Sequence, residues 1–145
     1  MTVKQISTIL DNRPGALLKF AKILERSSID LRALSLAEHE DFGTVRVIVD
    51  KPYNTIRMLK AEGYTCSITE VIAVRIEDKP GSLINILSTL SKNNINLEYS
   101  YAFFGRKADT VFTILRVEDP DLAVKVLQEA GIEPISQDDL GKLFR

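Results

Sequence analysis

Two short turns in this sequence combine residue types that can bind a small charged molecule. Residues 11–15 read Asp-Asn-Arg-Pro-Gly and residues 78–81 read Asp-Lys-Pro-Gly, each before an amphipathic segment. A turn that leads into a helix leaves backbone N–H groups without acceptors at the positive end of the helix dipole. Such an end favours a carboxylate or a phosphate. Glycine at positions 15 and 81 also lets a ligand approach the backbone closely.

Asn12 and Asp78 each lie two residues before the proline of their turn. A side-chain oxygen at this place can cap the helix or accept a hydrogen bond from an ammonium group. With the backbone N–H groups, it would complement the two charges of an α-amino acid. An ordinary turn and helix start that bind no ligand explain the same residues, so both interpretations stay open at this point.

The chain repeats itself with a shift of 66 residues. After a two-residue adjustment in the middle, Pro52 also falls on Pro120 and Gly63 on Gly131. The sequence therefore predicts two domains, at residues 1–70 and 71–145. The shift aligns prolines, glycines and apolar residues: Pro14 with Pro80, Gly15 with Gly81, Leu17 with Leu83, Leu24 with Leu90, and Ile29 with Ile95.

Each half predicts the order βαββαβ. Short segments rich in β-branched residues predict strands at 3–10, 29–38, 43–50 and 64–70, then at 71–77, 95–104, 109–117 and 132–135. Strands that alternate with only two helices, with one hairpin in the middle, indicate an α+β fold. In this fold a four-stranded antiparallel sheet carries both helices on one face.

The helices are expected to follow the prolines. Pro14 and Pro80 are expected in the first turns of two helices, and Pro52 and Pro120 open two more. Gly63 and Gly131 suit the left-handed position after the second helix of each half. Apolar residues at i, i+3, i+4 and i+7 indicate the buried faces: Leu17, Phe20, Ala21 and Leu24, then Leu83, Ile86, Leu87 and Leu90, then Ala123, Val126, Leu127 and Ala130.

The composition and net charge of the chain exclude several classes of function. The 145 residues include 19 Lys plus Arg and 20 Asp plus Glu, and this net charge of −1 argues against nucleic acid as a partner. No apolar run has the length of a signal peptide or a membrane span. A single cysteine, Cys66, fits a cytoplasmic protein, and with one histidine, His39, it leaves no His/Cys metal cluster. A catalytic or nucleotide-binding motif is not visible, so we expect neither an enzyme nor a cofactor.

Three aromatic residues alternate along the predicted strand 95–104. Tyr99, Tyr101 and Phe103 could form a wall for a ligand side chain, or they could pack inside the protein. Packing is the more common role of such residues, and we favour it.

The two turns and the segments after them carry a family resemblance. The sequence Asn-Arg-Pro-Gly-Ala-Leu, an amphipathic helix and then Ser-Ile-Asp-Leu resembles an ACT domain, and so does the second copy with Asp-Lys-Pro-Gly-Ser-Leu and Asn-Ile-Asn-Leu. The resemblance covers nearly the whole chain as two tandem domains. It implies the ferredoxin-like fold and amino-acid binding at interfaces between paired domains.

The resemblance also implies which residues bind the ligand. In the family a ligand contacts the loop of one domain and a strand of its neighbour, which would unite Asn12 with Asn96, and Asp78 with Asp30. Two carboxylates would repel each other and an anionic ligand group, so we expect the Asn12/Asn96 site to bind. Calorimetry with Asn12→Ala and Asp78→Ala would separate the two. The residues implied are Asn12, Arg13, Pro14, Gly15, Ala16, Leu17 and Asp30 in the first copy, and Asp78, Pro80, Gly81, Ser82, Leu83 and Asn96 in the second.

These expectations together predict a cytoplasmic sensor that binds an amino acid between its domains and regulates amino-acid metabolism. Open sheet edges favour a homodimer. The alternative is an adaptor or regulatory subunit of a separate metabolic enzyme that binds no small ligand.

Overall fold

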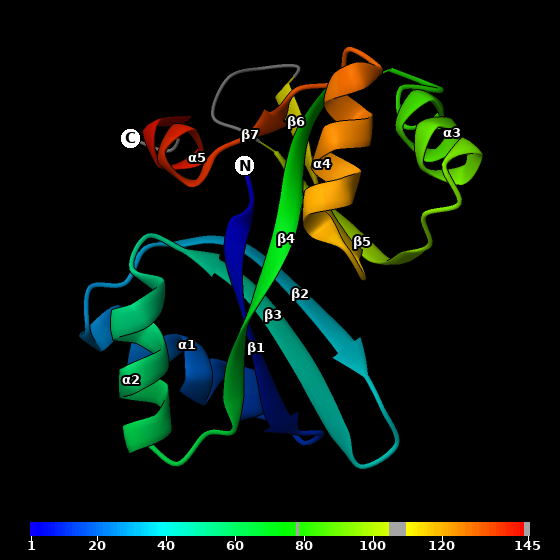
Figure 1. Cartoon of the computed structure of the whole chain (residues 1–145). Coiled ribbons are helices and arrows are strands. Elements are labelled where there is room, and N and C mark those ends of the chain that lie inside the picture. The colour runs from blue at the N-terminus through cyan, green and yellow to red at the C-terminus, as the bar shows by residue number, and fades with distance from the viewer. Residues whose placement is uncertain (78, 105–109, 144–145) are drawn as a thin grey trace. The chain divides into compact units, whose positions relative to one another are not determined.

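The structure is a computed structural model that describes residues 1–77, 79–104 and 110–143. The chain divides into two compact units (Figure 1). We call Lys4–Thr69 the first unit, and Met1–Val3 together with Glu70–Arg145 the second unit.

The first unit has the strand order β2-β3-β1-β4. Strand β3 lies between β1 and β2 and is antiparallel to both. This is the ferredoxin-like arrangement that the sequence predicts. Its elements are β1 (Val3–Asp11), α1 (Ala16–Arg26), β2 (Leu31–Glu38), β3 (Phe42–Val49), α2 (Pro52–Ala61) and the first residues of β4 (Cys66–Glu77).

The second unit repeats this arrangement. Strand β4 lies between β6 and β7, and β5 pairs with the other side of β6, all antiparallel. The twofold βαββαβ fold is thus confirmed. The elements are the rest of β4, α3 (Ile84–Lys92), β5 (Leu97–Phe104), β6 (Thr110–Val117), α4 (Pro120–Glu129), β7 (Pro134–Ile135) and α5 (Gln137–Leu143).

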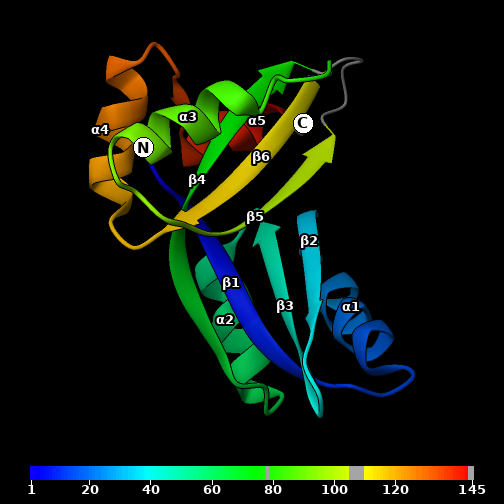
Figure 2. The same cartoon turned by 90° about the vertical axis from the view of Figure 1, so that its right-hand side faces the viewer.

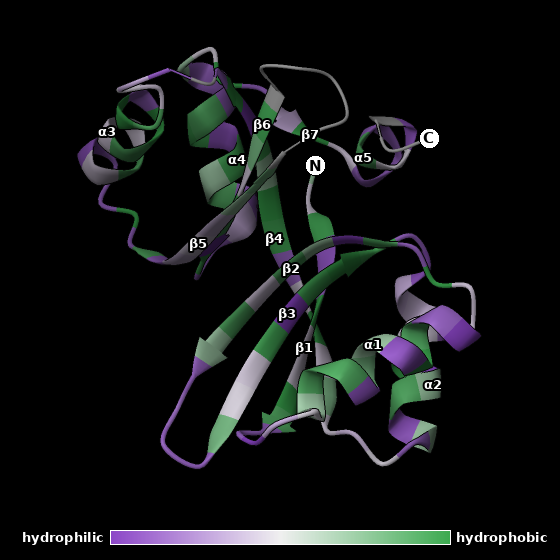
Figure 3. Ribbon diagram, turned by 180° about the vertical axis from the view of Figure 1, so that it is seen from behind, coloured by the Kyte–Doolittle hydropathy of each residue, from purple (hydrophilic) through white to green (hydrophobic). Residues whose placement is uncertain are grey.

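Each unit has a core between its sheet and its two helices. In the first unit Phe20 and Leu59 come from the helices, and Ile6, Val45 and Val47 from the strands. The second core is built in the same way, with buried residues of α3, α4, β4 and β6. Hydrophobic and hydrophilic residues alternate along α1 and α2 (Figure 3), because only one side of each helix meets the core.

The predicted helix faces need correction. In α1 the buried residues are Phe20, Ile23 and Leu24, whereas Leu17 is only partly buried. Leu83 and Leu87 were predicted to be buried, but they are 36% and 39% exposed. In α4 Val124 is buried in place of Val126 and Ala130. Half of each predicted face is buried as expected: Phe20 and Leu24, Ile86 and Leu90, and Ala123 and Leu127. The other predicted positions are partly buried or exposed.

The helix starts also differ in part from the prediction. Pro52 and Pro120 are the first residues of α2 and α4, as expected. Pro14 and Pro80 lie before their helices, because α1 begins at Ala16 and α3 at Ile84. The glycine after each of these two prolines has a positive φ and so leaves the helical conformation.

Strands at the end of each copy differ most from the prediction. The predicted strands 64–70 and 71–77 form one strand, β4. The predicted strand 132–135 is reduced to Pro134–Ile135, and the residues after it contain α5. Figures 1 and 2 show α5 on the opposite face of β4 and β6 from α3 and α4. The connection between the predicted strands 95–104 and 109–117 lies outside the described residues.

Candidate functional site

The described residues of the two predicted turns have closely similar backbone hydrogen bonds and glycine φ angles. The N–H of Arg13 donates to Asp11 O at 3.0 Å, and the N–H of Lys79 donates to Glu77 O at 2.9 Å. Gly15 and Gly81 follow with φ of 85° and 84°, a region that a residue with a Cβ rarely adopts. The duplication therefore extends to the turn geometry.

Asn12 does not cap α1. The N-cap position is held by Gly15, and no side chain bonds to the helix start. The Asn12 side chain instead donates through Nδ2 to His39 O at 3.3 Å, which ties the first turn to the turn between β2 and β3. Among the described residues Oδ1 of Asn12 has no donor, so this oxygen is available for an ammonium group.

The first turn lines a cavity of about 230 Å³ within the first unit. Leu10, Gly43 and Glu38 lie side by side on β1, β3 and β2 and form one row of its wall. Because Gly43 has no side chain, it leaves room beside Leu36, whose Cδ1 would be 3.3 Å from an added Cβ. The full lining is Leu10, Asp11, Asn12, Arg13, Ala16, Leu17, Leu36, Ala37, Glu38 and Gly43.

Polar and apolar groups are both present in this cavity. The N–H group of Leu17, at the start of α1, has no acceptor among the described residues. The Arg13 guanidinium lies 3.2 Å from Asp11 Oδ2, and both side chains are about 70% exposed. Leu10, Leu17 and Leu36 provide apolar surface. The site can thus offer donors to a carboxylate, acceptors to an ammonium and an apolar wall to a side chain.

Pro14 and Gly15 do not line this cavity. Gly15 lines an open groove of about 500 Å³ along the outer side of α1, together with Lys19, Lys22 and Arg26. Pro14 is exposed on the turn itself. Their contribution is to the conformation of the turn.

Asp30 is distant from the first turn. It precedes β2, whereas the cavity lies at Glu38 at the other end of this strand, about 25 Å away at the usual rise of a strand. The carboxylate of Asp30 is 3.2 Å from Arg32 Nη2, and its N–H donates to Asp50 Oδ1 at 3.0 Å. Asp30 is therefore already paired with a cation that the sequence analysis did not consider.

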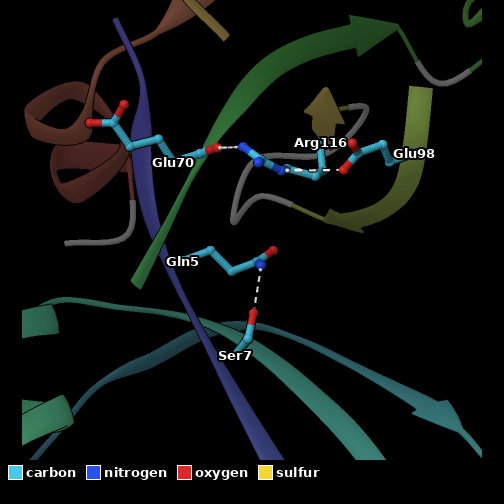
Figure 4. Close-up of polar contacts among 5 residues, drawn as sticks. All are labelled: Gln5, Ser7, Glu70, Glu98 and Arg116. Atoms are coloured by element: carbon cyan, nitrogen blue, oxygen red, sulfur yellow. Dashed lines mark hydrogen bonds and ion pairs between the residues drawn. The ribbon is translucent and has the colours of Figure 1, made fainter. Parts of the chain in front are cut away.

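Asn96 lines a separate cavity of about 120 Å³ in the second unit. The other residues that line it include Glu98, Glu118 and Asp119. Arg116 holds Glu98 in place, with Nε 3.5 Å from Oε2, while its Nη1 donates to Glu70 O at 2.9 Å (Figure 4). The same figure shows a partly buried polar contact of the first unit, in which Gln5 Nε2 donates to Ser7 Oγ at 3.1 Å.

In the second turn the basic side chain lies closer to its carboxylate partner than Arg13 lies to Asp11 in the first turn. Lys79 Nζ is 2.6 Å from Glu77 Oε2. This hydrogen bond and the ion pair lower the pKa of Glu77 and raise the pKa of Lys79. Ser82 Oγ donates to Lys79 O at 2.9 Å, and Pro80 and Gly81 are exposed. Asp78 lies outside the described residues.

Sequence reasoning missed the strand side of the cavity. Leu36, Ala37 and Glu38 line it, and no sequence motif marks them. The repeat aligns the loops and helices but does not show which strand end lies beside a turn. The structure also has no group of three His, Cys, Asp or Glu able to hold a metal ion within its described part. In the same part no helix is long and apolar enough to cross a membrane.

Comparison with known proteins identifies the family to which this chain belongs. The sequence matches the family model described as an ACT domain pair over residues 1–144. The structure of protein BT0572 from Bacteroides thetaiotaomicron is similar, with 32% identity, a TM-score of 0.90 and coverage of 99% of this chain and 98% of that one. A search of curated proteins finds no match.

More distant structures share the fold. The ligand-free regulatory subunit of aspartate kinase from Thermus thermophilus has 16% identity and a TM-score of 0.63, covering 88% of this chain and 91% of that one. The corresponding subunit from Thermus flavus has 14% identity and a TM-score of 0.60, with 88% and 92% coverage. The chain belongs to the ACT domain family, as an ACT domain pair.

Proposed function

We propose that this protein is a small-molecule sensor that binds an α-amino acid at the first turn and regulates a metabolic enzyme. The observation that carries the proposal is the cavity of about 230 Å³ beside Asn12, Arg13 and the start of α1. At roughly 30 Å³ for each water molecule, this volume matches about eight waters and so suits a ligand of amino-acid size.

Each charge of an amino acid has a complement in this cavity. The ligand carboxylate would accept hydrogen bonds from Arg13 and from the N–H of Leu17, and it would lie near the positive end of α1. The ammonium would donate to Oδ1 of Asn12 and to the carboxylate of Glu38. Leu10 and Leu36 favour an apolar ligand side chain.

The proposed regulation follows from differential binding. A ligand shifts a protein between two states only to the extent that it binds one of them more tightly. The fold is shared with a regulatory subunit of aspartate kinase, which supports an enzyme as the partner to be regulated. Completion of the site by Asn96 from a neighbouring domain, the separate Asp78/Asp30 site and a cytoplasmic location stay predictions from the sequence. The same holds for the absence of catalytic activity.

A thermal-shift screen with the twenty amino acids tests this function. A ligand at 100 times its dissociation constant stabilises the folded state by about 2.7 kcal/mol. We expect at least one apolar amino acid to raise the melting temperature and Asn12→Ala to remove the effect. Asn54→Ala is the matched control, because Asn54 is an exposed asparagine on α2 outside the cavity.

The alternative has its own result in this screen. If none of the amino acids shifts the melting temperature or gives heat in calorimetry, the sensor proposal is wrong. An enzyme that then co-purifies with the ligand-free protein would identify an adaptor instead.

A further inference from the structure

The outer side of α3 is unusual for a helix in contact with water. Leu83, at its N-cap, Ile84 and Leu87 are 36%, 63% and 39% exposed and lie within about one turn. The helix has a single charged residue, Lys92, at its end. Figure 2 shows α3 in front of β4 and β6, as an outer layer of the second unit. The remaining positions in this outer side are small and polar without charge: Asn85, Ser88 and Ser91.

Helix α1 provides an internal comparison, because the repeat puts it at the same place in the first unit. Leu18 of α1 corresponds to Ile84 of α3, and both are exposed, at 59% and 63%. Around Leu18 the helix is charged, as expected of a solvated face. Lys19, Lys22, Glu25 and Arg26 stand where α3 has Asn85, Ser88, Ser91 and Lys92.

The comparison shows that the fold does not require an uncharged outer side at this helix. Three of the four charges of α1 are absent from α3, and Ala21 is replaced by the larger, apolar Leu87. Both differences lower the cost of removing α3 from water, because charges need not be desolvated and more apolar surface is covered. The outer side of α3 is thus suited to contact with another protein surface.

The near absence of charge on the outer side of α3 indicates which protein surface is its partner. In a two-fold contact each surface meets a copy of itself, so a central charge would face a like charge. Hydroxyl and amide groups can donate and accept, and they can therefore bond to their own copies. Ser88, at the middle of the helix, has this property, whereas an acidic partner would find only Lys92 as a counter-charge. We propose that α3 packs against α3 of a second copy of this chain.

The size of the surface sets the strength of this contact. A helix of nine residues is about 13.5 Å long. A stable interface covers about 800 Å² on each partner, more than one short helix can provide. We therefore expect weak self-association that depends on protein concentration. This inference is independent of amino-acid binding, and it uses a helix surface where the sequence suggested sheet edges.

Sedimentation velocity over a series of protein concentrations tests the contact. The unmodified protein should show a sedimentation coefficient that rises with concentration. Ile84→Lys should weaken self-association by about tenfold or more. Leu18→Lys is the matched control, since it makes the same change at the equivalent, equally exposed position of α1 and should leave self-association unchanged. Circular dichroism melts would show that both variants are folded.

A charge-swap experiment checks that α3 meets its own copy. Ser88→Lys and Ser88→Glu should each be monomeric alone, because two like charges meet at the centre of the contact. A mixture of the two variants should associate again. The proposal is overturned if the unmodified protein is monomeric at every concentration, if Ile84→Lys associates normally, or if the mixture stays monomeric. An equal loss in Leu18→Lys would overturn it too.

Discussion

At the scale of a single residue, a substitution of Leu36 distinguishes a role in ligand binding from a role in the stability of the fold. It lines the cavity at the first turn and is 51% exposed, so it contributes little to the core. We expect Leu36→Ala to weaken amino-acid binding by up to about tenfold, roughly the value of burying one or two methylene groups. Calorimetry measures this loss.

Leu34 is the control for that substitution. It lies on the same strand, is 39% exposed and does not line the cavity. Leu34→Ala should leave the ligand affinity unchanged. Equal losses of affinity in the two variants would place the ligand elsewhere.

Cys66 should react slowly in the folded protein. Burial raises the pKa of its thiol, and Lys60 only partly offsets this effect. The thiolate is the reactive form, so a raised pKa leaves less of it at pH 8. Alkylation by iodoacetamide should be slower than in the urea-unfolded chain, and the rate should keep rising as the pH exceeds the usual pKa of cysteine. Equal rates in the folded and unfolded protein would contradict this.

The sequence identified one side of the candidate site. Asn12 follows from the chemistry of the turn, and Arg13, Ala16 and Leu17 follow from the resemblance to an ACT domain. All four line one cavity. The opposite wall depends on strand pairing, which places Glu38 beside Gly43 and Gly43 beside Leu10. A local pattern does not contain this register. Nor does it show that Asn12 bonds to His39 rather than to the helix.

At the scale of the elements, the helices of the two copies end in closely similar ways. After α1, Ile29 N–H donates to Leu24 O, and after α3, Ile95 N–H donates to Leu90 O, at 3.0 and 2.9 Å. The residue before each of these has a left-handed backbone, with φ of 55° at Ser28 and 56° at Asn94. Gly63 and Gly131 have this conformation after α2 and α4.

Ser28→Gly should therefore stabilise the protein. A residue with a Cβ is strained at this φ, whereas glycine is not, and we expect a gain of about 0.5 to 1 kcal/mol in the free energy of unfolding. Ser27→Gly is the control, because φ at Ser27 is −98° and glycine relieves no strain there. Urea unfolding should show a higher midpoint for Ser28→Gly only. A lower midpoint for both variants would mean that the Ser28 side chain has another role.

Strand β4 shows why some elements could not be delimited from the sequence. Residues 66–77 read Cys-Ser-Ile-Thr-Glu-Val-Ile-Ala-Val-Arg-Ile-Glu, with no glycine, proline or asparagine to end one strand and begin another. The repeat predicts a boundary between two strands at residue 70, but the local sequence contains no signal that would end a strand there. By contrast, α5 follows the repeat and has no counterpart in the first copy, so only its own weak pattern could have predicted it.

At the scale of the whole molecule, the two copies have similar backbone structures but differ in the side chains on their surfaces. In their described residues the two turns share the φ angle of the glycine and the backbone hydrogen bonds, while the sequence has Asp78 and Lys79 in place of Asn12 and Arg13. The first helices of the two copies share exposed apolar residues but differ in charge. Such divergence is expected when one backbone is kept and each copy acquires its own binding surface.

We expect one amino acid to bind per chain. Arg13 has five donors, so its contact with Asp11 leaves several for a ligand carboxylate. Lys79 is bound to Glu77 at 2.6 Å, and the raised pKa of Lys79 reflects this hydrogen bond and the charge of Glu77. A ligand carboxylate at the second turn would have to share the Lys79 ammonium with Glu77, and the two carboxylates would repel each other. Calorimetry should therefore give a stoichiometry of one, with binding reduced by Arg13→Gln and unchanged by Lys79→Gln. Two sites per chain, or equal effects of these substitutions, would show that the turns bind alike despite their different side chains.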